Sequence, residues 1–566
     1  MKVLQLHADY IEYQPVKKEI NLAEESDKSK VRYEEIVVLL TTVEAGDDEK
    51  VVDAAVADVG KSLVRLGVNK ILIYPYAHLS QSLAPPEQAL SVLRSFEKAA
   101  RDAGLVVNRA PFGWTKSLAI SVKGHPLAEQ SKAYGSGSIA VSGASGRKVQ
   151  RAYTEKEMLA RIRKSDFVGL PEYDHRVLGE RLDLFSFHEP SPGMVFWHDK
   201  GLKLKHILFD FIRRQLSKHG YIEISTPPLA NTVLWRVSGH WEHYKDNMFI
   251  TELGGEEFGL KPMNCPSTFL FYKSRRWSYR DLPLKVADFD PLFRNELSGV
   301  ASGLFRVRVF EQDDGHIFAA ERDVEPVLSE MLEMLKEMYS VFGLNYSLKI
   351  STMPDDHIGT VEQWNEAQAT LFRVCEGLGL RPSVKEKEGA FYGPKIDVDV
   401  KDSLGREWQL ATIQLDYQMP KRFELTYEGA DGKEHTPVVI HRVIYGSLER
   451  FIGILLEHFK GNLPVWLCPV QAKVITVSES SKGYGLDVLT KLRAAGLRAE
   501  GDFDDATVGS KVKAAQILKI PYMIVVGEAE SKSQTVSVRT RDGTKRQGLT
   551  VEQLIEEIGG AIRNYR

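Results

Sequence analysis

Glycine and serine crowd residues 135–146, and this stretch separates two regions that have regular helix and strand patterns. Such a composition is typical of loops and linkers, because neither residue favours a helix or a strand. The chain has 566 residues, and one domain contains about 100–200 residues. We therefore expect three or four domains, with a boundary near residue 143. The alternative for this stretch is a surface hairpin inside a single domain.

Composition narrows the class of protein. Hydrophobic residues make up 43% and charged residues 27% of the chain, as in ordinary globular proteins. No run of about 18 apolar residues occurs, so we expect no membrane span. The start, MKVLQLHADYIEY, lacks the apolar core of a signal peptide. Only three cysteines occur, far apart, which excludes a disulfide framework and favours a reducing compartment such as the cytoplasm. A net charge of −3 excludes a polycation but not a local nucleic-acid site.

Three regions differ in their patterns. Residues 1–143 alternate strand-like and helix-like segments, and residues 150–167 are charged and predict a helical connector. The pattern changes from about residue 174. Apolar positions at 204–216 predict a helix, with Gly220 as its C-terminal cap and a short strand, 221–225, after it. After residue 462, alternating strands and helices predict a small α/β domain with a mostly parallel core.

The densest polar pattern is FRNELSGVASGLFRVRVFEQDDGHIF, at 293–318. If residues 304–316 are extended, every second side chain points to one face. That face carries two guanidiniums, an amide, a carboxylate and an imidazole, from Arg306, Arg308, Gln312, Asp314 and His316. Arginine suits phosphate because its planar fork binds two oxygens. The pattern predicts a site for a polyanion and a small polar ligand. The alternative is a solvated edge strand, with Gly315 breaking the alternation.

These residues resemble motif 2 of a class II aminoacyl-tRNA synthetase, in its threonyl form. Pro227, after the helix and strand, resembles the motif 1 proline at the dimer interface, and GSLERF, residues 446–451, resembles motif 3. The segments KPMNCP, AFYGPKID, WQLATIQLD and HRVIYGSLERF match the threonyl branch in order. The resemblance covers roughly residues 172–566.

Residues 1–143 resemble the archaeal editing domain, which is similar to D-aminoacyl-tRNA deacylases, through MKVLQLHADYIEY, YPYAHLS and FGWTKSLAISVKGHPLAE. The resemblance implies an α/β and α+β multidomain protein. We expect a deacylase-like α/β editing domain at 1–143, a linker at 144–171, a catalytic domain at 172–462 and an α/β anticodon-binding domain at 463–566. The catalytic domain would hold the class II antiparallel sheet flanked by helices.

The resemblance also implies one Zn²⁺ per chain, bound by Cys265, His316 and His441. Their spacing alone does not indicate a metal, since a lone cysteine is usually a small core residue. A zinc with an open position suits threonine, because it binds the amino group and the hydroxyl that valine lacks. The resemblance further gives threonine-binding roles to Asp314, Gln312 and Tyr392.

The implied reaction activates L-threonine with ATP and transfers it to tRNA(Thr). Arg294 and Arg450 would stabilise the first step as catalytic residues, and Mg²⁺ would share the phosphate charge. The ATP-binding residues implied are Arg294, Glu296, Arg306, Gln414 and Arg450. His240 would assist proton movement in the transfer; the alternative is an unremarkable histidine of an exposed loop.

In the editing domain, the resemblance implies pocket roles for His78, Lys116 and Glu129. Lysine and glutamate could equally form an ordinary surface pair. Thr115 departs from the tyrosine often found before this lysine. In the C-terminal domain, Arg539 and Arg541 are the anticodon candidates; the alternative is a solvated strand face. Asp504 and Asp505 depart from the basic stretch often found there.

Two other functions remain as alternatives. One is a deacylase paralogue whose synthetase core is inactive, and the other is a non-enzymatic RNA-binding relative. Both predict missing ATP or metal residues, and none is missing from the motifs above. We therefore expect a threonine–tRNA ligase with serine editing, acting as a cytoplasmic homodimer with no membrane contact.

Overall fold

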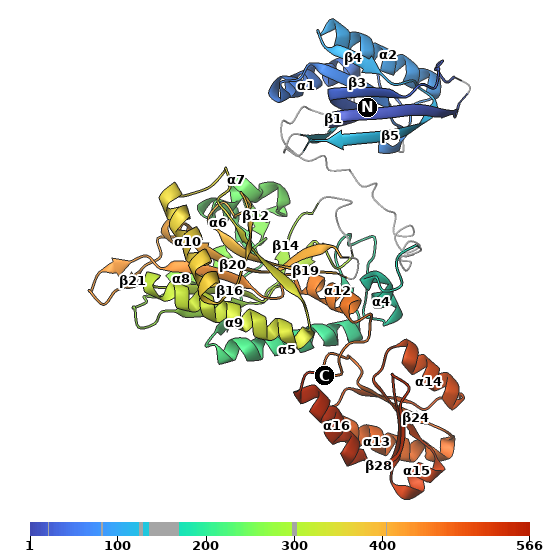
Figure 1. Cartoon of the computed structure of the whole chain (residues 1–566), viewed down its shortest axis with the longest axis vertical. Helices are drawn as coiled ribbons and strands as arrows, with labels where there is room; N and C mark the ends of the chain where they lie inside the picture. Colours follow the sequence, from blue (N-terminus) through green and yellow to red (C-terminus); the bar gives the residue numbers. More distant parts are fainter. Residues whose placement is uncertain (21, 81–82, 124–127, 135–168, 297–302, 403–404) are drawn as a thin grey trace. The chain divides into compact units, whose positions relative to one another are not determined.

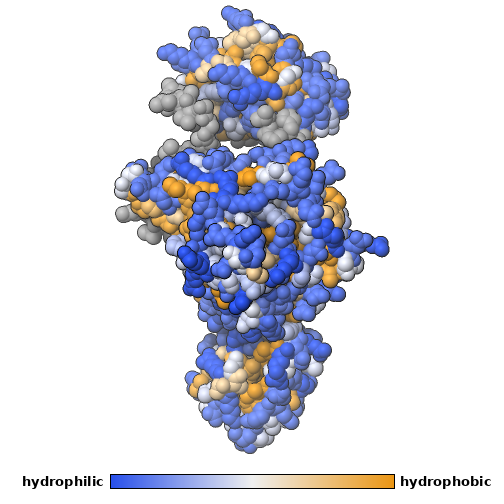
Figure 2. All heavy atoms as spheres, turned by 90° about the vertical axis from the view of Figure 1, so that its left-hand side faces the viewer, coloured by the Kyte–Doolittle hydropathy of each residue, from blue (hydrophilic) through white to orange (hydrophobic). Residues whose placement is uncertain are grey.

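The computed structural model describes the chain except residues 21, 81–82, 124–127, 135–168, 297–302 and 403–404. It divides into two compact units, Met1–Gln150 and Arg151–Arg566. The predicted connector helix at 150–167, and most of the predicted linker, lie outside the described residues. No helix in the described part of the chain is long and apolar enough to cross a membrane. On the face drawn in Figure 2, hydrophilic surface predominates and apolar residues form separate patches.

The first unit is a mixed sheet with two helices on one face (Figure 1). The strand order is β4-β3-β2-β1-β5, and β6 also pairs with β1. Residues of α1 and α2 pack with one face of the sheet, and the other face buries apolar residues of the strands themselves. The elements are β1 (Lys2–Lys18), β2 (Val31–Thr42), α1 (Glu49–Leu66), β3 (Lys70–Pro75), α2 (Pro86–Asp102), β4 (Val106–Arg109), β5 (Trp114–Val122) and β6 (Glu129–Ala133).

The sheet of this unit curls along its long first strand. β1 contains two irregularities in its pairing with β5, between Ala8 and Tyr10 and between Pro15 and Lys17. Such bulges bend a strand and increase its twist. The ring of Tyr13 on β1 packs edge-on against that of Tyr74 on β3, with centroids 5.7 Å apart.

The second unit is built on an eight-stranded sheet, in the order β18-β17-β19-β20-β23-β16-β13-β9. The expected antiparallel class II sheet is confirmed in its centre, whereas the outermost pairs β9–β13 and β17–β18 are parallel. The strands are β9 (Ile222–Ile224), β13 (Leu284–Asp288), β16 (Asp314–Ala319), β17 (Tyr346–Ser351), β18 (Ser383–Lys385), β19 (Lys395–Lys401), β20 (Glu407–Asp416) and β23 (Val438–Val443).

Helices cover this sheet and leave one part of it lined by polar side chains. Residues of α5, α9 and α12 form the largest core, and α9 and α10 contribute to a second one. The helices are α4 (His175–Arg181), α5 (Asp199–Lys218), α6 (Thr232–Val237), α7 (His240–Tyr244), α8 (Cys265–Lys273), α9 (Val324–Phe342), α10 (Val361–Gly377), α11 (Met419–Arg422) and α12 (Leu448–His458). Small pairs complete it: β7 (Phe185–Ser186) with β8 (Phe196–Trp197), β14 (Leu292–Phe293) with β15 (Val309–Phe310), β21 (Tyr427–Glu428) with β22 (Glu434–His435), and β12 (Glu256–Leu260) with β10 (Leu229–Asn231) and β11 (Ile250–Leu253).

The C-terminal part has a five-stranded sheet in the order β25-β24-β26-β27-β28. The predicted α/β class is confirmed, but only the pairs of β24 with β25 and β26 are parallel, and the other two pairs are antiparallel. The elements are β24 (Ala472–Thr476), α13 (Lys482–Ala494), β25 (Ala499–Asp502), α14 (Val508–Ile517), β26 (Tyr522–Val526), α15 (Glu528–Ser533), β27 (Val536–Thr540), β28 (Lys545–Leu549) and α16 (Val551–Arg563).

Candidate active site

Three potential metal ligands converge on the large sheet. Cys265 is the first residue of α8, His316 lies on β16 and His441 lies on β23. One ligand atom from each lies within 4.8 Å of the others, and all three side chains are buried. His316 and His441 are directly opposite each other in the pair β16–β23, so both imidazoles project to one side of the sheet. Sheet register therefore assembles residues that are far apart in the sequence.

The hydrogen bonding and protonation of these three side chains are suited to binding a metal ion. Within the described structure, Nδ1 of His316 is buried without a hydrogen-bond partner. Burial lowers the pKa of His316 well below its ordinary value, so the imidazole is neutral, as a metal ligand must be. Burial raises the pKa of the Cys265 thiol, an effect that a bound cation reverses. One cysteine and two histidines form a set that zinc binds, with a fourth position left open.

A fourth buried residue, which the sequence analysis missed, orients this triad. Oδ2 of Asp416 lies 2.9 Å from Nε2 of His441, and the other carboxylate oxygen accepts the backbone N–H groups of Gln418 and Met419. With Nε2 engaged, Nδ1 of His441 is the atom left for a metal. Asp416 is the last residue of the segment WQLATIQLD. Nothing in that segment distinguishes an aspartate that orients a metal ligand from an ordinary aspartate at the end of a strand.

The predicted threonine-binding residues surround the triad. Asp314 starts β16, and one of its carboxylate oxygens accepts a hydrogen bond from Asn264 at 3.2 Å. Burial raises the pKa of the Asp314 carboxyl. The buried ring of Tyr392 lies 5.4 Å from that of His441. Gln312 pairs with Ser447 in an isolated β-bridge, and Gln414 lies opposite His441 in the sheet. A small polar ligand at the triad would therefore meet carboxylate, amide and phenol groups.

The three predicted phosphate-binding arginines also lie close to one another. Arg450 lies in the first turn of α12, where its guanidinium donates to the carbonyls of Phe305 and Gln409. Burial, followed by the charges of Arg294 and Arg306, lowers the pKa of Arg450 to about 10. The positive charges of the three arginines repel one another, and this repulsion favours a bound anion. The predicted adenine contact, Glu296, instead accepts a hydrogen bond from Arg306 at 2.9 Å.

The condition considered for 304–316, a single extended segment, is not met. Residues 303–305 form a turn, β15 covers only Val309–Phe310, and β16 begins at Asp314. Arg306 is consequently half-exposed, while Asp314 and His316 are buried together on β16. Gly315 does not break the alternation, because it lies inside β16, where a Cβ atom would lie 2.8 Å from the Arg442 guanidinium. The glycine leaves space for a buried arginine.

His240 does not lie in an exposed loop, as the alternative interpretation supposed. It starts α7 and is fully buried. Its Nδ1 lies 2.8 Å from the Ser238 hydroxyl and its Nε2 lies 2.9 Å from the Met263 sulfur. Burial, assisted by the charge of His441, lowers its pKa to about 3. The imidazole is therefore neutral at pH 7.

A second buried cluster ties the motif 2 segment to the helices. Nδ1 of His175 donates to Glu457 of α12 at 2.9 Å, and its Nε2 accepts the backbone N–H of Leu304 at 3.0 Å. Asp174 accepts two hydrogen bonds from the Arg176 guanidinium. Although three potential ligands meet here, these contacts already engage them, so the cluster serves structure.

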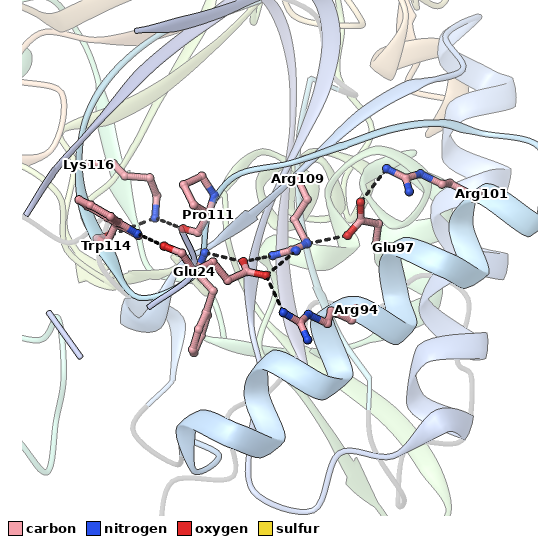
Figure 3. A network of polar contacts seen from close by, with 9 residues as sticks. Glu24, Arg94, Glu97, Arg101, Arg109, Pro111, Trp114 and Lys116 are labelled. Atoms are coloured by element: carbon pink, nitrogen blue, oxygen red, sulfur yellow. Dashed lines mark hydrogen bonds and ion pairs between the residues drawn. The ribbon is translucent and has the colours of Figure 1, made fainter. Parts of the chain in front are cut away.

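In the first unit, Lys116 lies on β5 in a partly buried position (Figure 3). Its Nζ donates to the carbonyls of Pro111 and Trp114, both at 3.0 Å, and burial lowers its pKa to about 8. Glu129 starts β6 and is exposed. Lys116 lies opposite Pro15 and Glu129 opposite Leu6, near the two ends of β1, and no contact joins the two side chains in the described structure. The side chain of His78 lies outside the described residues.

The two anticodon candidates differ in their surroundings. Arg539 lies on β27, opposite Met523. Arg541 follows that strand, and its Nη1 donates to the carbonyl of Leu463 at 2.7 Å. Asp504 and Asp505 lie in the bend before α14. Arg541 is therefore bonded to the segment that leads into this part of the chain, and among the described residues no such hydrogen bond joins Arg539 to that segment.

Family models match three parts of the chain. Residues 1–134 match the archaea-specific editing domain of threonyl-tRNA synthetase. Residues 248–459 match the tRNA synthetase class II core domain of the G, H, P, S and T enzymes. Residues 471–560 match an anticodon binding domain.

Individual relatives agree with these models. The chain is 45% identical over 421 residues to threonine–tRNA ligase of Natranaerobius thermophilus, covering 72% of this chain and 66% of that protein. It is 49% identical over 368 residues to the enzyme of Symbiobacterium thermophilum, covering 65% and 56%. A crystal structure described as the RNA binding domain of threonyl-tRNA synthetase from Cryptosporidium parvum is 43% identical, with a TM-score of 0.67, covering 69% of this chain and 98% of that one. The chain spans less than two thirds of the length of these two curated relatives.

Proposed function

The chain belongs to the threonyl-tRNA synthetase family, and from this premise we propose that it ligates L-threonine to tRNA(Thr) and hydrolyses mischarged seryl-tRNA(Thr). The observation that carries the proposal is the buried triad Cys265, His316 and His441 beside the carboxylate of Asp314. A metal site next to a polar pocket suits an amino acid that carries a hydroxyl.

Threonine recognition follows from the chemistry of that pocket. Cys265, His316 and His441 would hold Zn²⁺, which would supply a Lewis acid for the amino group and side-chain hydroxyl of threonine. Asp314 accepts a hydrogen bond from the hydroxyl, and Gln312 and Tyr392 hold the amino acid. Valine has a methyl group in place of the hydroxyl and would leave these polar groups unpaired, which rejects it strongly.

The first step forms threonyl-adenylate. A carboxylate oxygen of threonine attacks the α-phosphorus of ATP, and pyrophosphate leaves. Mg²⁺ bound with ATP would share the phosphate charge. Arg294 holds the α-phosphate and the carboxylate, while Arg306 and Arg450 hold the β- and γ-phosphates. Glu296 contacts adenine, and Gln414 contacts the nucleotide. Burial, followed by the charges of Arg294 and Arg306, lowers the pKa of Arg450, and this supports the assignment because phosphate charge would offset both effects.

The second step transfers the threonyl group to tRNA. A ribose hydroxyl of the terminal adenosine attacks the adenylate carbonyl, and AMP leaves. His240 accepts the hydroxyl proton. Its imidazole is unprotonated at neutral pH, as a base must be, but a pKa of about 3 makes it a weak base, so the assignment rests on the matching position in the segment SGHW.

Editing is needed because the synthetic site discriminates poorly between threonine and serine. Serine carries the same amino and hydroxyl groups and lacks one methyl, a difference of about 1–3 kcal/mol. The synthetic site would therefore load some serine, and the N-terminal domain would remove it. We assign the editing pocket to His78, Lys116 and Glu129.

The remaining assignments concern partners and organisation. Residues 1–143, 144–171, 172–462 and 463–566 are the editing domain, linker, catalytic domain and anticodon-binding domain. Of the two anticodon candidates, Arg539 contacts the anticodon, whereas Arg541 donates to the carbonyl of Leu463 and stabilises the fold. The protein is a cytoplasmic homodimer, and the exposed apolar side chains of Ile222 and Val233, on either side of Pro227, support an interface there.

ATP–pyrophosphate exchange with threonine, serine and valine, together with the zinc content, tests the proposal. We expect strong exchange with threonine, weaker exchange with serine, none with valine, and about one zinc per chain. Well-folded protein that exchanges with no amino acid would contradict the synthetic function and favour an editing paralogue.

A further inference from the structure

The turn at residues 112–113, which leads into β5 and Lys116, packs closely against the segment before β2 that contains Glu24. Glu24 forms three hydrogen bonds with Phe112 and Trp114. Its carboxylate accepts the Phe112 N–H at 3.0 Å, its carbonyl accepts the Trp114 indole N–H at 2.7 Å, and its N–H donates to the Phe112 carbonyl at 3.1 Å. Gly113 has a φ of +80°, and a Cβ atom there would lie 2.8 Å from the backbone of Ala23. The two segments therefore fit together at backbone level.

Charged side chains fix Glu24 in turn (Figure 3). Arg109, at the end of β4, donates to both its carboxylate oxygens, at 2.6 and 2.9 Å. Arg109 also donates to Glu97 of α2 at 2.6 Å, and Arg94 of the same helix donates to Glu24 at 3.1 Å. The Glu24 and Arg109 side chains are only 16% and 13% exposed. Bidentate pairs of this kind fix geometry as well as charge.

The same turn forms a cradle for the Lys116 amine. The two carbonyls that accept Nζ belong to Pro111, next to Phe112, and to Trp114. Glu24 therefore holds a group beside each carbonyl. The ring of Tyr74, which packs against that of Tyr13, lies 4.9 Å from Nζ. No carboxylate of the described residues forms an ion pair with Lys116. A lysine ammonium has three N–H donors, so two are engaged and one remains for a substrate oxygen.

We propose that Glu24 is a positioning residue of the editing site, which fixes the carbonyl cradle and so aims the free N–H of Lys116 at the substrate. This inference rests on the proposed editing function. It goes further by assigning a role to Glu24 and its partner Arg109, neither of which contacts the substrate. Without the Glu24 carboxylate the turn loosens, water reaches Nζ, and Lys116 behaves more like an ordinary exposed lysine.

The test compares full-length variants in the hydrolysis of seryl-tRNA(Thr). Glu24→Gln keeps the side-chain shape but loses the charge that pairs with Arg109. We expect kcat to fall at least tenfold with KM changed less, and the alkaline break of the pH–rate profile to move above its starting value near 8. Arg101→Gln removes a charge that pairs with Glu97 but not with Glu24, and it should leave rate and profile unchanged. Threonine-dependent exchange should be unchanged in both.

Two further variants separate the possible failures. Lys116→Met should abolish hydrolysis; if it does not, both the assigned editing role of Lys116 and the positioning inference are overturned. If Lys116→Met is inactive while Glu24→Gln keeps the parent rate and profile, only the positioning inference is overturned. Should Glu24→Gln fail to fold, Trp114→Phe removes the indole N–H and keeps most of the ring volume. It must move the break in the same direction, and an unmoved break would overturn the inference.

Discussion

Nε2 of His441 and Oδ2 of Asp416 lie 2.9 Å apart, and the carboxylate is completely buried. Asp416 and His441 come from neighbouring strands, β20 and β23, and their contact is diagonal, since Asp416 lies opposite Val439. The aspartate is itself fixed by two backbone N–H groups. This arrangement sets which nitrogen of His441 faces the other two members of the triad.

Asp416→Asn is therefore expected to weaken zinc binding about 10–100-fold. The amide can still form a hydrogen bond, but it does not increase the basicity of the imidazole as a carboxylate does. Competition of a chelator for zinc measures the change directly, without relying on activity. Asp431→Asn, at an exposed aspartate, is the control. Unchanged zinc affinity in Asp416→Asn would remove Asp416 from the metal site.

Cys265→Ser is expected to abolish zinc binding and threonine-dependent ATP–pyrophosphate exchange, while the fold persists. A serine hydroxyl is a poor zinc ligand compared with a thiolate. Elemental analysis, exchange assays and circular dichroism measure the three effects. Cys375→Ser, which alters another buried cysteine far from the triad in sequence, should retain its zinc. Exchange that persists in zinc-free Cys265→Ser would rule out the metal role.

Deletion of residues 1–143 is expected to preserve threonine charging and to let seryl-tRNA(Thr) accumulate. The deleted residues fall within a compact unit of their own, so the catalytic sheet stays intact. Charging assays with threonine and serine, with the full chain as control, measure both effects. If the truncated protein clears mischarged tRNA as fast as the full chain, editing lies in another part of the protein.

His175→Ala is expected to lower kcat/KM for ATP by about tenfold, equivalent to about 1.4 kcal/mol of lost transition-state stabilisation. The histidine joins Glu457 of α12 to the N–H of Leu304, and the next residue, Phe305, accepts a hydrogen bond from Arg450. Losing this link should loosen the segment that carries Arg306. Exchange kinetics at varied ATP measure the effect, with exposed His206→Ala as control. Equal kinetics in both variants would contradict the link.

The sequence predicted the chemistry of the site better than its geometry. Cys265, His316 and His441 could be named from motif resemblance, but only the β16–β23 register explains why the two histidines meet. Asp416 could not be found, because its role depends on a diagonal contact between strands. The assumption that residues 304–316 form one extended segment was wrong, because the alternation of polar side chains alone cannot reveal the turn at Gly303.

The alternation of strands and helices expected after residue 462 is confirmed, and β26 (Tyr522–Val526) is one of its apolar strands. These strands are short apolar runs buried in their own small core, so local sequence decides them. Strand direction was harder to predict. β27 and β28 form a hairpin on an otherwise parallel sheet, and β28 has the exposed, polar sequence KRQGL, which gave no apolar signal.

The C-terminal arginines give the last prediction. Arg541 donates to the carbonyl of Leu463, whereas Arg539 has no such link. We therefore expect Arg541→Met to lower Tm by a few degrees, because a partly buried charged hydrogen bond contributes about 1 kcal/mol. Arg539→Met should leave Tm unchanged and raise KM for tRNA. Thermal melting and charging kinetics of both variants separate stabilisation from recognition. A raised KM in Arg541→Met without a change in Tm would instead make Arg541 a direct tRNA contact.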